Sequence, residues 1–112
     1  MSATKILIIA GCTGTGKTGA SVALAKHFNG ELVGADSVQV YRGFDIGSAK
    51  PSEAELEGVP HHLIDVVDPD ENIDAMDYAR RADAVIKDIC ERGRLPIIVG
   101  GTGLWIRALV RG

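Results

Sequence analysis

The octapeptide GCTGTGKT, from Gly11 to Thr18, limits the possible folds more than any other part of the chain. It matches the pattern GxxxxGK[ST] in full, it follows the apolar run 6–10, and a segment rich in helix-forming residues comes after it. A strand that leads through a glycine-rich turn into a helix directs several backbone N–H groups to one point, where the helix dipole adds positive potential. This context predicts a phosphate-binding loop and disfavours the alternative, a glycine-rich turn without a ligand.

Every residue of the octapeptide is a candidate phosphate ligand. The candidates are Gly11, Cys12, Thr13, Gly14, Thr15, Gly16, Lys17 and Thr18. In such a loop the ammonium group of Lys17 contacts the outer phosphate oxygens, and the hydroxyl of Thr18 completes a magnesium shell. The motif alone does not identify the molecule that carries the phosphates.

Four apolar runs predict buried strands, and helical segments separate them. The runs are rich in Ile, Val and Leu and do not alternate, which is typical of parallel strands covered on both faces. The predicted strands are Lys5–Ala10, Glu31–Ala35, His62–Val67 and Leu95–Val99. The predicted helices are Lys17–Phe28, Ser52–Glu57, Asp74–Arg92 and a last one from about Thr102 to Leu109. This order predicts an α/β fold like that of P-loop NTPases, a three-layer sandwich with a mostly parallel sheet and its ligands at the C-terminal edge of the strands.

Two of the predicted helices have an apolar side that we expect to be buried. In the first helix this side consists of Ala20, Ala23, Leu24 and Phe28. In the long third helix it consists of Met76, Ala79, Ala82, Ile86 and Ile89. The opposite side of the third helix carries charges spaced i, i+4, which we interpret as solvent-exposed pairs: Asp77–Arg81, Asp83–Lys87 and Asp88–Arg92. A capping box of Ser52 and Glu55 is expected to begin the short second helix.

Length and composition restrict the class of protein. The 112 residues suffice for at most one domain, and 46% apolar residues are ordinary for a globular protein. The net charge of −3 excludes a uniformly basic surface but allows a local basic groove for nucleic acid. Cys12 and Cys90 suggest neither a disulfide framework nor a zinc site, so we expect a reducing, cytoplasmic location. No apolar stretch has membrane-spanning length, and the first residues lack a signal-peptide pattern.

Two further clusters follow predicted strands and therefore belong at the same edge of the sheet. Asp36, directly after the second strand, can act as a general base, as an outer-shell partner of magnesium, or as a cap of the following turn. After the fourth strand, the glycines around Thr102 allow the backbone to approach a ligand, and Thr102 offers a hydroxyl. An ordinary helix N-cap is the alternative for Thr102. Residues 41–51 form a long irregular segment that suits a loop over the site.

One expected feature of a kinase or ATPase is missing. Those enzymes usually have an apolar strand that ends in Asp and organises magnesium. The fourth predicted strand instead continues into Gly100 and Gly101, and Asp65 and Asp68 fit the role poorly. The absence disfavours a kinase or ATPase.

Four segments together resemble the bacterial tRNA dimethylallyltransferases. They are GCTGTGKT, ADSVQVYRGFDIGSAKP at 35–51, VPHHLIDVVDP at 59–69, and LPIIVGGTGLWIRAL at 95–109. The resemblance covers nearly the whole chain, in order, and this combination is far more specific than the phosphate loop alone. It implies transfer of a dimethylallyl group, with Mg²⁺, from dimethylallyl diphosphate to N6 of the adenine next to the tRNA anticodon.

The resemblance also implies roles for individual residues. Residues 11–18 would hold the diphosphate of the prenyl donor and not ATP, with Lys17 and Thr18-bound Mg²⁺ neutralising the leaving group. Asp36 would accept the proton of the adenine amine, and Thr102 would lie at the reaction channel. The residues expected to contact tRNA are Asp36, Ser37, Val38 and Gln39. A monomer is favoured.

The chain differs from the family pattern in three side chains and in length. Cys12 stands where the family usually has Pro, Ser48 replaces a common Thr, and Trp105 replaces the usual Tyr. Family members are much longer, so residues 1–112 are expected to be the N-terminal part of a P-loop prenyltransferase domain, without the tRNA-binding insert. We expect the fragment alone to be inactive. An adenylate isopentenyltransferase that modifies free nucleotides, and a P-loop kinase or ATPase, are the alternatives.

Overall fold

Four parallel strands form one sheet in the computed structural model, which describes residues 6–10, 17–37, 40–43, 53–64 and 66–111. In the order of the sheet, the strands are β1 (Leu7–Ala10), β4 (Leu95–Gly100), β2 (Gly30–Gly34) and β3 (His61–His62). β4 pairs with β1 on one side and with β2 on the other, and every pairing is parallel. The predicted parallel sheet is therefore confirmed.

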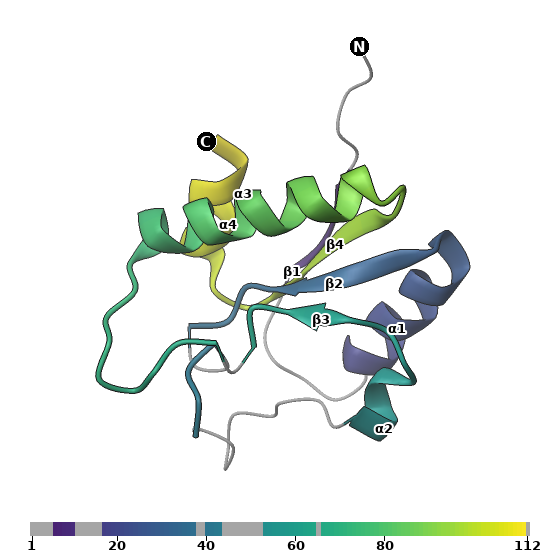
Figure 1. Ribbon diagram of the computed structural model, residues 1–112, viewed down its shortest axis with the longest axis horizontal. Helices are drawn as coiled ribbons and strands as arrows, with labels where there is room; N and C mark the ends of the chain where they lie inside the picture. Colours follow the sequence, from purple (N-terminus) through teal and green to yellow (C-terminus); the bar gives the residue numbers. More distant parts are fainter. Residues whose placement is uncertain (1–5, 11–16, 38–39, 44–52, 65, 112) are drawn as a thin grey trace.

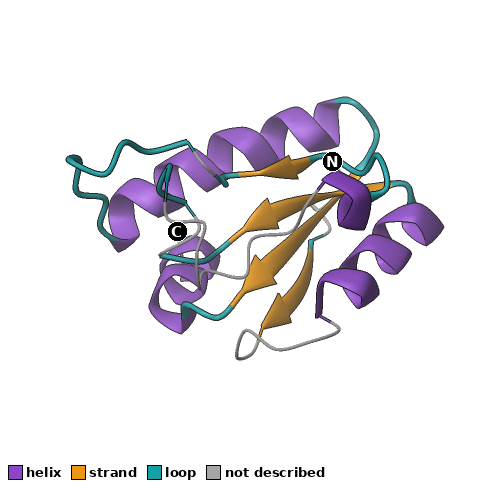
Figure 2. Cartoon of the chain, turned by 90° about the horizontal axis from the view of Figure 1, so that it is seen from below, coloured by secondary structure: helices purple, strands orange, loops and turns teal. Residues whose placement is uncertain are grey.

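Helices cover both faces of this sheet, as Figures 1 and 2 show. The helix α1 (Lys17–Phe28) packs on one face, together with the short α2 (Glu53–Leu56). On the other face lie α3 (Ala75–Glu91) and α4 (Gly103–Arg111), which also pack against each other. The molecule is thus the predicted three-layer α/β sandwich.

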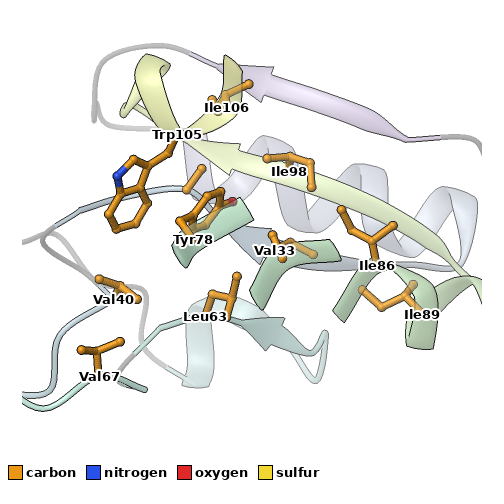
Figure 3. Packing of buried hydrophobic residues seen from close by; sticks show 12 residues of the cluster. Val33, Val40, Leu63, Val67, Tyr78, Ile86, Ile89, Ile98, Trp105 and Ile106 are labelled. Carbon is orange, nitrogen blue, oxygen red and sulfur yellow. The ribbon is translucent and has the colours of Figure 1, made fainter. Parts of the chain in front are cut away.

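The two hydrophobic clusters follow from the alternation of side chains along each strand. Leu32 and Ile97 point toward α1 and pack with Val22 and Ala25. Their neighbours in the chain, Val33 and Ile98, belong to the larger cluster under α3 and α4. Figure 3 shows this larger cluster, with Tyr78 and Trp105 toward one end and Ile86 and Ile89 toward the other. Because both faces of β2 and β4 are covered, their sequences read as continuous apolar runs.

The third strand is shorter than predicted. It comprises only His61–His62, whereas the prediction extended to Val67. Leu63 has a φ of 62°, in the left-handed region that extended backbone does not use, so the chain leaves the sheet there. Farther along the chain, Val67 forms an isolated parallel bridge with Tyr41, outside the four strands of the sheet.

The prediction for the buried side of α1 was wrong. Ala20, Ala23 and Phe28 are exposed, and only Leu24 of the expected residues is partly buried. The residues that face the sheet are instead Ser21, Val22 and Ala25. Small and apolar residues occur on all sides of this helix, so its periodicity does not select one face.

The long helix was predicted more accurately. Asp74 caps α3 through a capping box with Asp77, and Arg92 follows its last residue, within one residue of the predicted bounds. Met76 is the exception among the expected core residues, because it is 54% exposed. Tyr78 is fully buried instead. Residues two apart lie about 200° apart around a helix, so Met76 and Tyr78 cannot both face the core.

The short helix α2 also begins and ends close to its predicted bounds. It comprises Glu53–Leu56, and the chain then turns through Glu57 and Gly58, both with positive φ. Ser52, the expected capping residue, lies outside the described residues. No helix in the described part of the chain is long and apolar enough to cross a membrane.

Candidate functional site

Three strands end together at one edge of the sheet, and this edge carries the candidate site. Ala10, the last residue of β1, is paired with Gly100, the last residue of β4. The chain after β2 joins them, because the N–H of Ala35 donates to the carbonyl of Val99 at 2.8 Å. Since α1 begins at Lys17, the segment 11–16 connects this edge to the start of a helix.

Gly100 brings the β4 and β2 ends unusually close together. A Cβ atom on this residue would overlap the carbonyl group and Cα of Ala35. Only glycine fits such a backbone contact. The residue before Asp36 is therefore held directly against the end of β4.

The two predicted clusters after β2 and β4 are joined by hydrogen bonds. The N–H of Ser37 donates to Oγ1 of Thr102 at 3.0 Å, and this hydroxyl in turn donates to Oγ of Ser37 at 3.4 Å. The backbone N–H of Thr102 donates to the carbonyl of Ala35 at 3.1 Å. Asp36, which is partly buried, lies between these two attachment points. The structure thus brings Asp36, Ser37 and Thr102 together as the sequence predicted.

The start of α4 shows how Thr102 is used. Its carbonyl accepts from the N–H groups of Trp105 at 3.1 Å and Ile106 at 3.2 Å, so Thr102 occupies the N-cap position. An N-cap side chain ordinarily accepts a hydrogen bond from its own helix. Within the described part of the chain, the Oγ1 of Thr102 is instead bonded to Ser37. The N-cap alternative therefore accounts for the hydrogen bonds of the Thr102 carbonyl, but it does not account for the hydrogen bonds of the Thr102 hydroxyl.

The loop that follows Asp36 is attached to the segment after β3. The N–H groups of Val66 and Val67 donate to the carbonyl of Val40 at 2.9 and 3.0 Å. The guanidinium of Arg42 pairs with the carboxylate of Asp68, and the backbone N–H of Ile73 donates to the hydroxyl of Tyr41 at 3.3 Å. Sequence reasoning did not find these contacts, because they join residues far apart in the chain, such as Arg42 and Asp68, which are 26 positions apart.

A cluster of charged side chains lies at the opposite edge, where β2 begins. The carboxylate of Glu31 is 1% exposed and accepts hydrogen bonds from two nitrogens of Arg92, one of them at 2.9 Å. Nε2 of His62 lies 2.7 Å from Glu31, and Nε of Arg94 lies 3.4 Å from it. The hydrogen bonds from Arg92 are the largest cause that lowers the pKa of Glu31 from 4.5 to about 2, against the opposing effect of burial.

This cluster corrects part of the sequence interpretation of α3. Arg92 does pair with Asp88 at 2.9 Å, as expected, but it also joins the buried Glu31 and is not merely a solvent-exposed charge. The pair Asp83–Lys87 is confirmed at 3.1 Å. Asp77 pairs with Arg80 instead of Arg81. An acidic residue inside an apolar strand was the available signal for a buried ion pair.

Several predicted site residues lie outside the described part of the structure. These are residues 11–16, Val38 and Gln39, together with the side chains of Lys17 and Thr18. The roles assigned to them remain predictions. Among the residues that the structure describes, no three His, Cys, Asp or Glu side chains come close enough together to hold a metal ion.

Comparison with known proteins identifies the family. A family model described as IPP transferase matches residues 39–112. The chain belongs to the IPP transferase family. Among curated members, it is 57% identical to the tRNA dimethylallyltransferase of Koribacter versatilis over 112 residues, which are all of this chain and 36% of the relative. It is 56% identical to the enzyme of that name from Anaeromyxobacter sp. over 108 residues, or 96% of this chain and 36% of the relative.

Solved structures of the family share the same fold. The full-length tRNA isopentenylpyrophosphate transferase from Bacillus halodurans matches with a TM-score of 0.93 and 51% identity, over 97% of this chain and 36% of that one. A eukaryotic dimethylallyltransferase acting on tRNA matches with a TM-score of 0.91 and 40% identity, over 96% and 27% of the two chains. This IPP transferase chain therefore spans about a third of the length of its relatives.

Proposed function

We propose that the chain is the N-terminal part of a tRNA dimethylallyltransferase. The whole enzyme would transfer the dimethylallyl group of dimethylallyl diphosphate to N6 of the adenine next to the anticodon, in the cytoplasm and as a monomer. The observation that carries the proposal is the likeness to enzymes of this name along the entire chain, at 57% identity. The joining of Asp36, Ser37 and Thr102 beside the end of β1 adds support, because it assembles the polar side chains at one edge.

Asp36 supplies the general base in this proposal. The exocyclic amine of adenine is a weak nucleophile, since its lone pair is delocalised into the ring. As the bond from N6 to the allylic carbon forms, positive charge develops on nitrogen, and the N6 proton passes to the carboxylate of Asp36. The bond between that carbon and the diphosphate oxygen breaks in the same process, and the diphosphate leaves with the electron pair. No attacking water takes part, which agrees with the missing Asp at the end of β4.

The diphosphate is assigned to residues 11–18. Backbone N–H groups between β1 and α1, with the N-terminus of a 12-residue helix behind them, suit an anion of this kind. Lys17 and the hydroxyl of Thr18 complete the site. Hydroxyl and phosphate oxygens are the hard donors that Mg²⁺ prefers, and a cluster of carboxylates is not required. When bound, Mg²⁺ neutralises the charge that develops on the leaving diphosphate.

The acceptor is assigned to the segment that begins with Asp36. Asp36, Ser37, Val38 and Gln39 are proposed to contact tRNA, with the target adenine extruded from its stack so that N6 can reach the base. The contacts of Val40 and Arg42 with the segment 66–68 hold the chain on the C-terminal side of these residues.

A comparison of Asp36→Asn with Asp70→Asn in the full-length parent tests this assignment. Asp70 is an exposed carboxylate on the loop after β3 and serves as the matched control. The transfer rate of Asp36→Asn is expected to fall by about 10²- to 10⁴-fold, while calorimetry shows unchanged binding of dimethylallyl diphosphate with Mg²⁺. Asp70→Asn should retain the rate of the wild type.

Other outcomes identify the alternatives. Full activity of Asp36→Asn would remove its role as base. Transfer to free AMP but not to tRNA would indicate an adenylate isopentenyltransferase. Tight binding and turnover of ATP in place of the prenyl donor would indicate a kinase or ATPase.

A further inference from the structure

We propose that Thr102 is a positioning residue, which orients the Asp36 carboxylate by holding the backbone on its C-terminal side. This inference rests on the proposed function, because it takes Asp36 to be the base of that reaction. It assigns to the Thr102 hydroxyl a role that is carried out through Ser37 and does not require contact with the substrate.

The backbone is held on both sides of Asp36. On the N-terminal side, Ala35 donates to Val99 at 2.8 Å and accepts from the N–H of Thr102 at 3.1 Å. On the C-terminal side, Ser37 donates to the Oγ1 of Thr102 at 3.0 Å. Thr102 is therefore the one described residue that bonds to both neighbours of Asp36. With both adjoining peptide groups fixed, the Cα–Cβ direction of Asp36 is fixed as well.

The Thr102 hydroxyl acts both as an acceptor and as a donor. As an acceptor it binds the Ser37 N–H, and as a donor it reaches the Ser37 Oγ at 3.4 Å. A hydroxyl that only capped α4 would accept from the helix itself. The side chain thus links the β2 end to the start of α4, across 65 positions of sequence.

Thr102 is itself attached to a rigid support. Three residues farther along α4, the buried indole ring of Trp105 stacks on the ring of Tyr78 in α3, with centroids 4.6 Å apart and an angle of 20° between the planes. Figure 3 shows this pair at the end of the core nearest to Val40. Such a stack restrains α4 relative to α3. Thr102 therefore connects the backbone on both sides of Asp36 to the hydrophobic core.

Variants of Thr102 in the full-length parent separate positioning from substrate contact. Thr102→Val keeps the shape of the side chain and removes the two hydrogen bonds between the Thr102 hydroxyl and Ser37. Thr102→Ser keeps the hydroxyl. For Thr102→Val, kcat is expected to fall by about 10- to 100-fold, because small displacements of a catalytic group have effects of this size. The KM for dimethylallyl diphosphate and for tRNA should remain within about twofold of wild type, and Thr102→Ser should recover most of kcat.

Amide hydrogen exchange provides a readout that is independent of activity. The Ser37 N–H of the wild type should be protected, and Thr102→Val should speed its exchange by about tenfold or more, in line with the loss of one hydrogen bond. Thr102→Ser should restore protection. The N–H of Asp77, which donates to Asp74 at 2.8 Å in the α3 cap, is the control and should not change.

Three results would overturn the proposal: an unprotected Ser37 amide in the wild type, an unchanged kcat in Thr102→Val, or a rise in KM without a loss of kcat. The first measurement needs no variant and stays decisive if Thr102→Val does not fold. Failure of the proposed function is distinguishable from all three. In that case the wild-type parent transfers no prenyl group to tRNA, while the exchange of Ser37 still reports on the link.

Discussion

The two edges of the sheet are held together by different interactions. At the C-terminal edge, Ala35, Ser37, Gly100 and Thr102 are connected by backbone contact and by hydrogen bonds between neutral groups. At the N-terminal edge, the buried carboxylate of Glu31 is paired with His62 of β3, with Arg92 at the end of α3 and with Arg94 in the turn before β4. Ion pairs thus stabilise the edge that has no assigned chemistry. At the edge where the reaction is proposed, the residues on both sides of Asp36 are held by backbone contact and by hydrogen bonds between neutral groups.

The strongest test of the C-terminal edge is Gly100→Ala. The new methyl group overlaps the backbone of Ala35, which cannot move without displacing β2 from β4. We expect the free energy of unfolding to fall by about 3 kcal/mol, at the upper end for overpacking because the opposing atoms are backbone. Urea denaturation measures the change. In the parent enzyme, transfer activity should fall as well, since Ala35 precedes Asp36.

Gly103→Ala is the matched control for this substitution. A Cβ on Gly103 meets no atom within 4 Å, and the residue lies in the first turn of α4. Its stability should be unchanged or higher by up to about 1 kcal/mol, because alanine favours helix more than glycine does. Equal losses in the two variants would contradict a special role for the Gly100–Ala35 contact.

The N-terminal edge is tested by Glu31→Gln. This substitution keeps the shape of the side chain but removes the charge that Arg92, Arg94 and His62 share. We expect a loss of about 2 kcal/mol in the free energy of unfolding at pH 7, because breaking a buried ion pair is costly while the arginines remain accessible to water. Asp83→Asn removes an exposed carboxylate paired with Lys87 and should change stability by less than about 0.5 kcal/mol.

A smaller and more specific effect is expected when the pH is lowered. The pKa of Glu31 is about 2 in the folded chain and 4.5 in its ordinary state. A group with a depressed folded pKa stabilises the fold above its unfolded pKa, and this contribution is lost as the pH falls toward the folded value. Between pH 6 and 3.5 the advantage of wild type over Glu31→Gln should therefore shrink by about 1 kcal/mol. A constant difference over this range would show that the carboxylate charge does not stabilise the N-terminal edge.

Local pattern was sufficient to predict most elements of the fold. Apolar runs located all four strands, and α1 has the predicted bounds Lys17–Phe28. The buried face of α1 could not be predicted, because small and apolar residues occur on all sides of that helix. β3 ends early because the backbone of Leu63 is left-handed. Leucine does not favour this conformation, so the sequence gives no signal for it.

The sequence predicted that Asp36 and Thr102 lie at one edge of the sheet, but it did not predict the hydrogen bonds around them. Asp36 and Thr102 were identified because parallel strands place their C-terminal ends at one edge. The bond from Ser37 to Thr102 joins residues 65 positions apart, and the bonds from Arg92 to Glu31 join residues 61 apart. Contacts at such separation depend on register and rotamer, which periodicity does not contain. The stacking of Tyr78 on Trp105 was missed for the same reason.

The position of β4 between β1 and β2 has a consequence for how the molecule assembles. β1 and β2 are consecutive strands in the described part of the chain, but they are not hydrogen-bonded to each other, because β4 (Leu95–Gly100) lies between them. Closure of the sheet is thus a long-range event, which slows folding in comparison with locally connected folds. Until that strand inserts, neither the anchor of Ala35 nor the link to Ser37 exists. A nascent chain that ends before Leu95 would lack the contacts with Val99 and Thr102 that hold the two neighbours of Asp36.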